Sequence, residues 1–211
     1  MKILAIDTSG TQAGVAVTEK NRVVLSKVVT AQEAGGWKHS QKLLPTIAGL
    51  LEEAGLTLAD IGKIAYTCGP GSFTGLRIGA AVALGLARGA GLPVVQVPTL
   101  DAMAYAGIGT DAVQIVPMLD ARRGEVYSAV YEKVYYPFNT LFPKRVTDYF
   151  ALPKDEMLGM AGKNAVFITE AVDPAAVGFC AFHLPEATTT EMLYVRPPQA
   201  VREAMAREAG A

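Results

Sequence analysis

The sequence predicts an α/β protein built from two lobes. Three observations indicate this fold: three short strand patterns open the chain, strand and helix patterns then alternate, and a second group of strand patterns begins near Ala112. With 211 residues, 51% of them hydrophobic, the chain can bury one substantial core or two small ones without disulfide bonds.

Three strands are expected at the amino terminus, where apolar and β-branched residues form three short runs. Short polar turns separate the runs, so the strands are expected to pair as an antiparallel meander. The expected strands span residues 2–7, 14–18 and 22–30.

Helix and strand patterns alternate after this meander. A first helix is expected over residues 40–54, with Gly55 as its C-terminal cap. Pro45 is expected in the opening turns of this helix, because a proline deeper inside costs about 3 kcal/mol. The next expected elements are a strand at 61–67, a helix at 73–88, a strand at 92–97 and a helix capped by Thr99. The order βββαβαβα is typical of a ribonuclease-H-like lobe, the unit that actin-like proteins use twice.

The second lobe is expected to be abbreviated. Strands are expected over residues 113–119 and 125–131, but several prolines interrupt the pattern beyond Glu132. Only a strand at 165–169 and a tail helix at 198–208 are expected there. The predicted division of the chain is a first lobe at 1–108, a second lobe at 109–195 and a C-terminal helix at 196–211 that could pack back on the first lobe.

Composition argues against several classes of protein. A net charge of −1 and a pI near 6.1 leave no basic excess for nucleic-acid binding, so tRNA contact is expected only through a partner. The amino-terminal apolar run meets Asp7 too soon for a secretion signal or a membrane span. With only two cysteines, Cys68 and Cys180, the chain is expected to be cytoplasmic and to keep free thiols.

A metal centre is not expected. Zinc and iron sites draw on closely spaced histidines, cysteines and carboxylates. His39 and His183 each lack a second histidine three or four residues away. Cys68 precedes a helix, but no histidine or acidic partner is evident near it, so a buried structural thiol is the better interpretation. No catalytic or metal-binding residue is assigned.

The turn at residues 69–72 joins a predicted strand to a predicted helix, where backbone N–H groups favour an anion. It matches neither the P-loop nor the dinucleotide pattern, so a tight structural turn is favoured over a phosphate site. In the helix that follows, Gly75, Gly79 and Ala83 recur every four residues and form one smooth stripe. The sequence leaves open whether this stripe packs on the sheet of the same chain or on a helix of a partner.

A second candidate site is the turn that ends the first strand. Actin-like kinases place such a turn around ATP phosphates and magnesium. Possible nucleotide or phosphate contacts are Asp7, Thr8, Ser9, Arg77 and Arg122. A glycine loop for adenosine is not visible near the end of the chain, and a hydrogen-bonded turn is an equally good interpretation of Asp7.

Longer motifs extend over most of the first 131 residues. They read IDTS at 6–9, GPGSFTGLRIG at 69–79 and DARRGEVY at 120–127. Together with His39-Ser40 and Leu43-Leu44-Pro45, they resemble the TsaB family, also called YeaZ. The resemblance implies an actin-like protein of two lobes that is the non-catalytic paralogue of TsaD.

The resemblance also implies partners and a function. The chain would pair with TsaD, which transfers a threonylcarbamoyl group to N6 of adenosine 37 in tRNA, and would work with the ATPase TsaE. It could also pair with itself. No cofactor is implied for the chain itself, although ATP or ADP could bind at the interface with its partner. The alternatives are a metal-independent actin-like ATPase and a glycoprotease-like hydrolase.

Family members pair through the first two helices of their first lobe. Carried over to this sequence, the resemblance implies an interface that includes the glycine stripe. The implied interface residues are His39, Leu43, Leu44, Ile47, Leu51, Phe73, Gly75, Leu76, Gly79 and Ala83.

Overall fold

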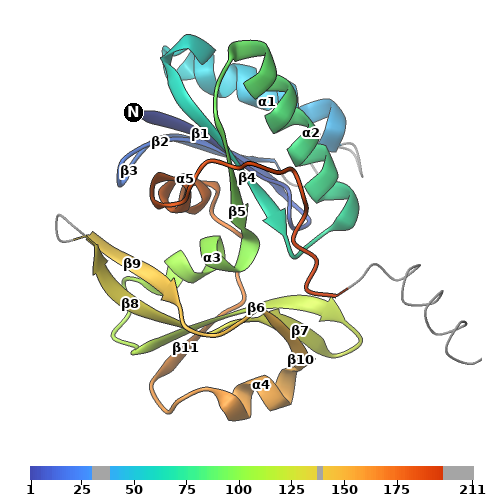
Figure 1. The fold of residues 1–211 in the computed structure, drawn as a ribbon, viewed down its shortest axis with the longest axis vertical. Coiled ribbons are helices and arrows are strands. Elements are labelled where there is room, and N and C mark those ends of the chain that lie inside the picture. The colour runs from blue at the N-terminus through green and yellow to red at the C-terminus, as the bar shows by residue number, and fades with distance from the viewer. Residues whose placement is uncertain (30–38, 137–139, 197–211) are drawn as a thin grey trace, which may run out of the picture.

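The computed structural model describes residues 1–29, 39–136 and 140–196. Within these residues the chain forms two sheets, one above the other in Figure 1, with helices packed on their faces. Each sheet is the centre of one lobe, so the predicted two-lobe α/β fold is confirmed.

The first sheet has 5 strands in the order β3-β2-β1-β4-β5. β1, β2 and β3 pair antiparallel, as predicted, whereas β4 and β5 run parallel to β1. Both faces of β1 are buried, which explains its unbroken run of apolar residues. The strands are β1 (Lys2–Asp7), β2 (Ala13–Glu19), β3 (Arg22–Val29), β4 (Ile61–Gly69) and β5 (Val94–Pro98).

Helices cover both faces of this sheet. α1 (His39–Glu53) and α2 (Phe73–Ala90) lie side by side on one face, where their apolar side chains share a core with Leu4 and Ile6. α3 (Thr99–Ala104) and α5 (Pro174–His183) lie on the other face, where their alanines pack against Ile3 and Ala5. Two short 3-10 helices, η1 (Leu58–Asp60) and η2 (Tyr105–Gly107), complete the connections.

The second sheet has 6 strands, with the path β10-β7-β6-β8-β9 and β11 paired to β6. Its strands are β6 (Gln114–Arg122), β7 (Glu125–Ser128), β8 (Tyr131–Tyr136), β9 (Thr140–Arg145), β10 (Phe150–Pro153) and β11 (Ala165–Ile168). One of its faces packs on α4 (Lys154–Met160) through Met157, and the other packs on α3 through Leu100 and Met103. Helix α3 therefore lies between the lobes and contacts both.

The second lobe shows the largest departure from the prediction. The strand expected at 125–131 divides into β7 and the start of β8, and β8, β9, β10, α4 and α5 were not expected. Prolines did not prevent strand formation here, because Pro143 and Pro153 lie in β9 and β10, the two ends of the sheet path. An edge strand tolerates a residue that cannot donate a backbone hydrogen bond.

Two local predictions concern prolines and caps. Pro45 lies within the first two turns of α1, as expected, and Gly55 follows the helix with a positive φ of 65°. The predicted cap at Thr99 is wrong: Pro98 occupies the cap position, and the buried Thr99 hydroxyl has no hydrogen-bond partner. The predicted tail helix at 198–208 lies outside the described residues.

The chain returns to the first lobe after the second sheet. α5 packs on β1 and β2, although its residues belong to the segment assigned to the second lobe, and residues 186–194 then run along β5 and β4. The boundary at 108/109 stays a prediction, but the segment 109–195 serves both lobes. Within the described part of the chain, no helix has the length and apolar character that crossing a bilayer would require.

Candidate functional site

The inner face of the α1–α2 layer is core. Leu43, Ile47 and Leu51 of α1 are buried, as are Leu76 and Ala83 of α2. These side chains already pack against the sheet of their own chain, and their role in an interface stays a prediction. Helical spacing shows that they share a face, but not which neighbour covers that face.

The glycines of the stripe lie against the turn after β1. A Cβ atom added to Gly75 would lie 2.2 Å from the backbone oxygen of Thr8, and one added to Gly79 would lie 2.2 Å from the Thr8 hydroxyl oxygen. Neither glycine therefore has room for a side chain. Both glycines therefore pack within the chain, and docking of a partner at Gly75 and Gly79 stays a prediction.

The outer face of the same two helices is exposed, and several of its residues are small. Leu44 keeps 47% and Phe73 keeps 44% of their surface. Other exposed positions on this side include Ala48 on α1 and Thr74, Arg77, Ala81, Gly85, Arg88 and Gly89 on α2. A Cβ atom added to Gly49, Gly85 or Gly89 would meet no atom within 4 Å, so nothing in the described chain requires these residues to be glycine.

Sequence reasoning missed the exposed row at Ala81, Gly85 and Gly89. The signal was present, because these residues also recur every four positions on α2. Two small-residue rows share one helix, and only the tertiary structure separates the row under Thr8 from the row facing outward. The His39 side chain lies outside the described part of the structure, although His39 begins α1.

A cleft of about 470 Å³ opens between the lobes. One wall combines the turn after β1 with the turn before α2, and the other wall is the β6–β7 hairpin. Its lining residues are Ser9, Gly10, Thr11, Gly71, Ser72, Phe73, Thr74, Leu119, Asp120, Ala121, Arg122 and Tyr127. The fold thus brings two predicted contacts, Ser9 and Arg122, to the same cleft from positions far apart in the sequence.

The other predicted nucleotide contacts do not line this cleft. The Asp7 carboxylate is buried, and one of its oxygens accepts hydrogen bonds from the Ser9 N–H (3.1 Å), the Ser9 hydroxyl (2.7 Å) and the Thr67 hydroxyl (2.8 Å). Burial raises the pKa of Asp7, although these hydrogen bonds oppose the shift. Thr8 packs under Gly79, and the Arg77 guanidinium lies over the Phe73 ring, 3.8 Å from its centre. These are the contacts of a hydrogen-bonded turn residue, and a nucleotide contact at Asp7 stays a prediction.

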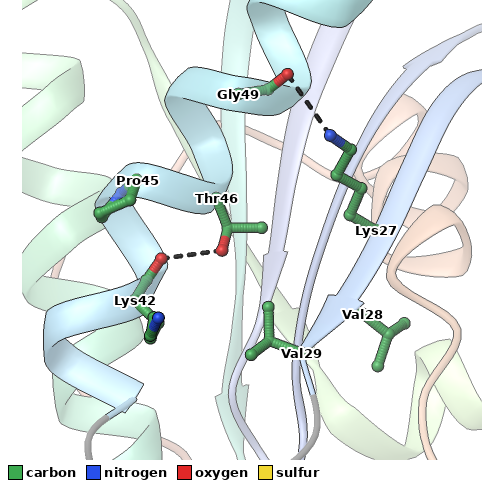
Figure 2. A pocket seen from close by; sticks show the side chains of 7 residues that line it. All are labelled: Lys27, Val28, Val29, Lys42, Pro45, Thr46 and Gly49. Atoms are coloured by element: carbon green, nitrogen blue, oxygen red, sulfur yellow. Dashed lines mark hydrogen bonds between the residues drawn. The ribbon is translucent and has the colours of Figure 1, made fainter. Parts of the chain in front are cut away.

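A second hollow, of about 560 Å³, lies between β3 and the flank of α1 (Figure 2). Lys27 crosses it, donating to the Gly49 carbonyl oxygen at 3.5 Å and pairing with Glu53 at 2.5 Å. On the helix side the Thr46 hydroxyl donates to the Lys42 carbonyl oxygen at 2.8 Å. Because Glu53 already neutralises Lys27, this hollow is a weak candidate for an anion site.

Reactive side chains are not grouped in the described residues. No cluster of three or more histidines, cysteines, aspartates or glutamates there is close enough to hold a metal ion. Both cysteines are free and buried, as predicted for a structural thiol at Cys68. Burial raises the pKa of Cys68 to about 12 and raises the pKa of Cys180 well above its usual range, so neither is a ready thiolate.

This sequence and this fold resemble those of known proteins. A family model described as TsaD, tRNA N6-adenosine threonylcarbamoyltransferase, matches residues 23–195. A relative from Haemophilus influenzae, named tRNA threonylcarbamoyladenosine biosynthesis protein TsaB, is 35% identical over 173 residues, which cover 78% of this chain and 70% of the relative. This chain belongs to the TsaB family.

The TsaB protein of Escherichia coli is 42% identical over 134 residues, or 63% of this chain. That match spans only 56% of the length of the E. coli protein. The solved structure of YeaZ from Pseudomonas aeruginosa has a TM-score of 0.72 and 26% identity, with 92% of this chain and 99% of that chain covered. The TsaB fold of this chain is therefore the actin-like, two-lobe α/β fold that the motifs implied.

Proposed function

We propose that this chain is the non-catalytic subunit that pairs with TsaD and enables threonylcarbamoyl transfer to N6 of adenosine 37 in tRNA. The observation that carries the proposal is the match to the H. influenzae TsaB protein, whose name places it in threonylcarbamoyladenosine biosynthesis. In this role TsaE is a further partner, and tRNA is reached through the complex rather than by this chain alone.

The outer face of α1 and α2 supports this role. A glycine inside a helix costs about 1 kcal/mol relative to alanine, and a Cβ atom at Gly85 would meet no atom within 4 Å, so no close approach in the described chain offsets this cost. Close approach of a helix from TsaD would supply such an offset. Leu44 and Phe73 would provide larger apolar contacts beside the small row, and we place the interface on these outward residues.

A supporting rather than a chemical role fits the groups available. The two thiols are buried, and the carboxylate of Asp7 serves the turn after β1. An independent actin-like ATPase would need a carboxylate directed at the phosphates and their magnesium, whereas the observed contacts of Asp7 all lie within its own turn and β4. We propose that ATP or ADP, if it binds to the cleft at Ser9 and Arg122, does so in the complex with the partners.

Reconstitution tests the proposal. tRNA threonylcarbamoylation is measured with TsaD, TsaE and the adenylate-forming enzyme TsaC of the same organism, with and without this chain. We expect modification only when the chain is present, and no peptidase activity or ATP turnover from the chain alone. Equal modification in its absence would overturn the proposal, and peptidase activity of the isolated chain would favour the glycoprotease-like alternative.

A further inference from the structure

The C-terminal part of the described chain, residues 186–196, forms a strap that leaves α5, crosses the first lobe and ends on the second (Figure 1). The path is visible as the red segment that runs over β5 and past the start of α2. The strap is a third connection between the lobes, after the segment that joins η2 to β6 and the segment that joins β11 to α5.

Backbone hydrogen bonds and apolar packing fix the strap to the first lobe. The Ala187 N–H donates to the Val94 carbonyl oxygen at 2.7 Å, and the Leu193 N–H donates to the Cys68 carbonyl oxygen at 2.8 Å. The Gln96 side chain donates to the Glu191 carbonyl oxygen at 2.8 Å. Met192 and Leu193 also pack on the core beneath α1 and α2, so this half of the strap is firmly attached.

The strap lies directly against the turn that leads into one wall of the cleft. Gly69 has a φ of 120°, and a Cβ atom there would lie 2.4 Å from the Leu193 carbonyl oxygen. Gly71 and Ser72, which follow this turn, line the cleft. One residue beyond Leu193, the Tyr194 ring lies 6.1 Å from the Phe73 ring, centre to centre.

The end of the strap holds the opposite wall. Two guanidinium nitrogens of Arg196 pair with the two carboxylate oxygens of Glu125, one of them at 2.8 Å, and the guanidinium also donates to the Ala151 carbonyl oxygen at 3.0 Å. Glu125 is the first residue of β7 and belongs to the β6–β7 hairpin, where it lies opposite Arg122. An exposed ion pair usually contributes little to stability. A two-point contact between a partly buried arginine and a carboxylate, however, fixes both the distance and the relative orientation of the two side chains.

We propose that residues 186–196 are a clasp that sets the width of the cleft between the lobes, with the Arg196–Glu125 ion pair as its closure. The opposing elements fit this role: α3 packs on both lobes but contributes no residue to the cleft walls, and so it serves as the pivot. When the ion pair breaks, the hairpin side of the cleft is free to move about α3 while the rest of the strap stays on the first lobe.

The test measures the distance between the lobes in the full chain. Spin labels on Ala59→Cys and Lys163→Cys report on the first and second lobe, because both positions are exposed and the native cysteines are buried. We expect Arg196→Met to broaden the distance distribution and to speed amide exchange of the hairpin at residues 118–128 about tenfold, with β1 unchanged. The double variant Arg196→Glu with Glu125→Arg should restore both readouts.

A matched control removes an ion pair that does not join the lobes. Arg22 and Glu19 pair at 3.3 Å within the first sheet, so Arg22→Met should leave the distance distribution as it is. If Arg196→Met gave the same spin-label distance distribution as the unchanged protein, the clasp proposal would be overturned. Failure of the charge-swapped variant to narrow a broadened distribution would also overturn it, since that result would assign the effect to general destabilisation.

Discussion

Helix α2 carries two rows of small residues that look alike in sequence and differ in their surroundings. A Cβ atom added to Gly75 or Gly79 would lie 2.2 Å from an atom of Thr8. A Cβ atom added to Gly85 or Gly89 would meet no atom within 4 Å. The inner row is small because its own chain fills the space. The outer row is small without any such reason in the described chain, and this difference indicates where a partner helix could approach.

The largest expected effect is on the inner row. Gly79→Leu should lower the free energy of unfolding by about 3 kcal/mol, because the new side chain would collide with Thr8 in a packed layer. Urea unfolding measures this loss. If Gly79→Leu kept its stability but no longer paired with TsaD, the inner row would be part of the interface. The distinction between the inner and the outer row would then be wrong.

The turn beneath the inner row is expected to show the next effect. Asp7→Ala removes the acceptor for the Ser9 and Thr67 hydroxyls, and buried donors without acceptors cost about 2 kcal/mol. Asp7→Asn is the matched control, because its side-chain oxygen can accept the same hydrogen bonds. Urea midpoints should therefore fall clearly for the alanine variant and little for the asparagine variant, and equal losses would contradict this account of the turn.

The outer row is expected to affect binding rather than stability. Gly85→Leu should leave the free energy of unfolding within about 1 kcal/mol, since a Cβ atom there would meet no atom within 4 Å and leucine favours the helix. Its affinity for TsaD should fall at least about tenfold, as measured by titration calorimetry. Gly159→Leu, at an equally open glycine in α4, is the control that should bind normally.

The smallest expected effect is a pH dependence at Asp7. Its pKa in the folded protein is raised above the ordinary 3.8 by burial, so the stability it contributes is present at low pH and is lost as pH rises through the raised value. The unchanged protein should therefore gain stability relative to Asp7→Asn as pH falls from 7 toward the ordinary pKa of 3.8. Urea unfolding across this pH range tests this, and a constant difference between the two proteins would count against the raised pKa.

The sequence alone determined most of the first lobe. Apolar runs and short turns predicted β1 to β3 as a meander, and helical spacing located α1 and α2 to within a few residues. These features depend on neighbours in the chain, which local patterns record. The family motifs were equally legible, because they are continuous segments such as residues 69–79 and 120–127.

The tertiary structure decided what each face meets. Spacing placed Gly75, Gly79 and Ala83 in one row, but only the approach of Thr8, from a distant part of the sequence, makes that row core. The proline-containing β9 and β10 form because they are edge strands, and Ser9 and Arg122 line one cleft because two lobes come together. Local sequence specifies which residues share a side of an element, whereas burial depends on contacts between distant segments, which exist only in the folded chain.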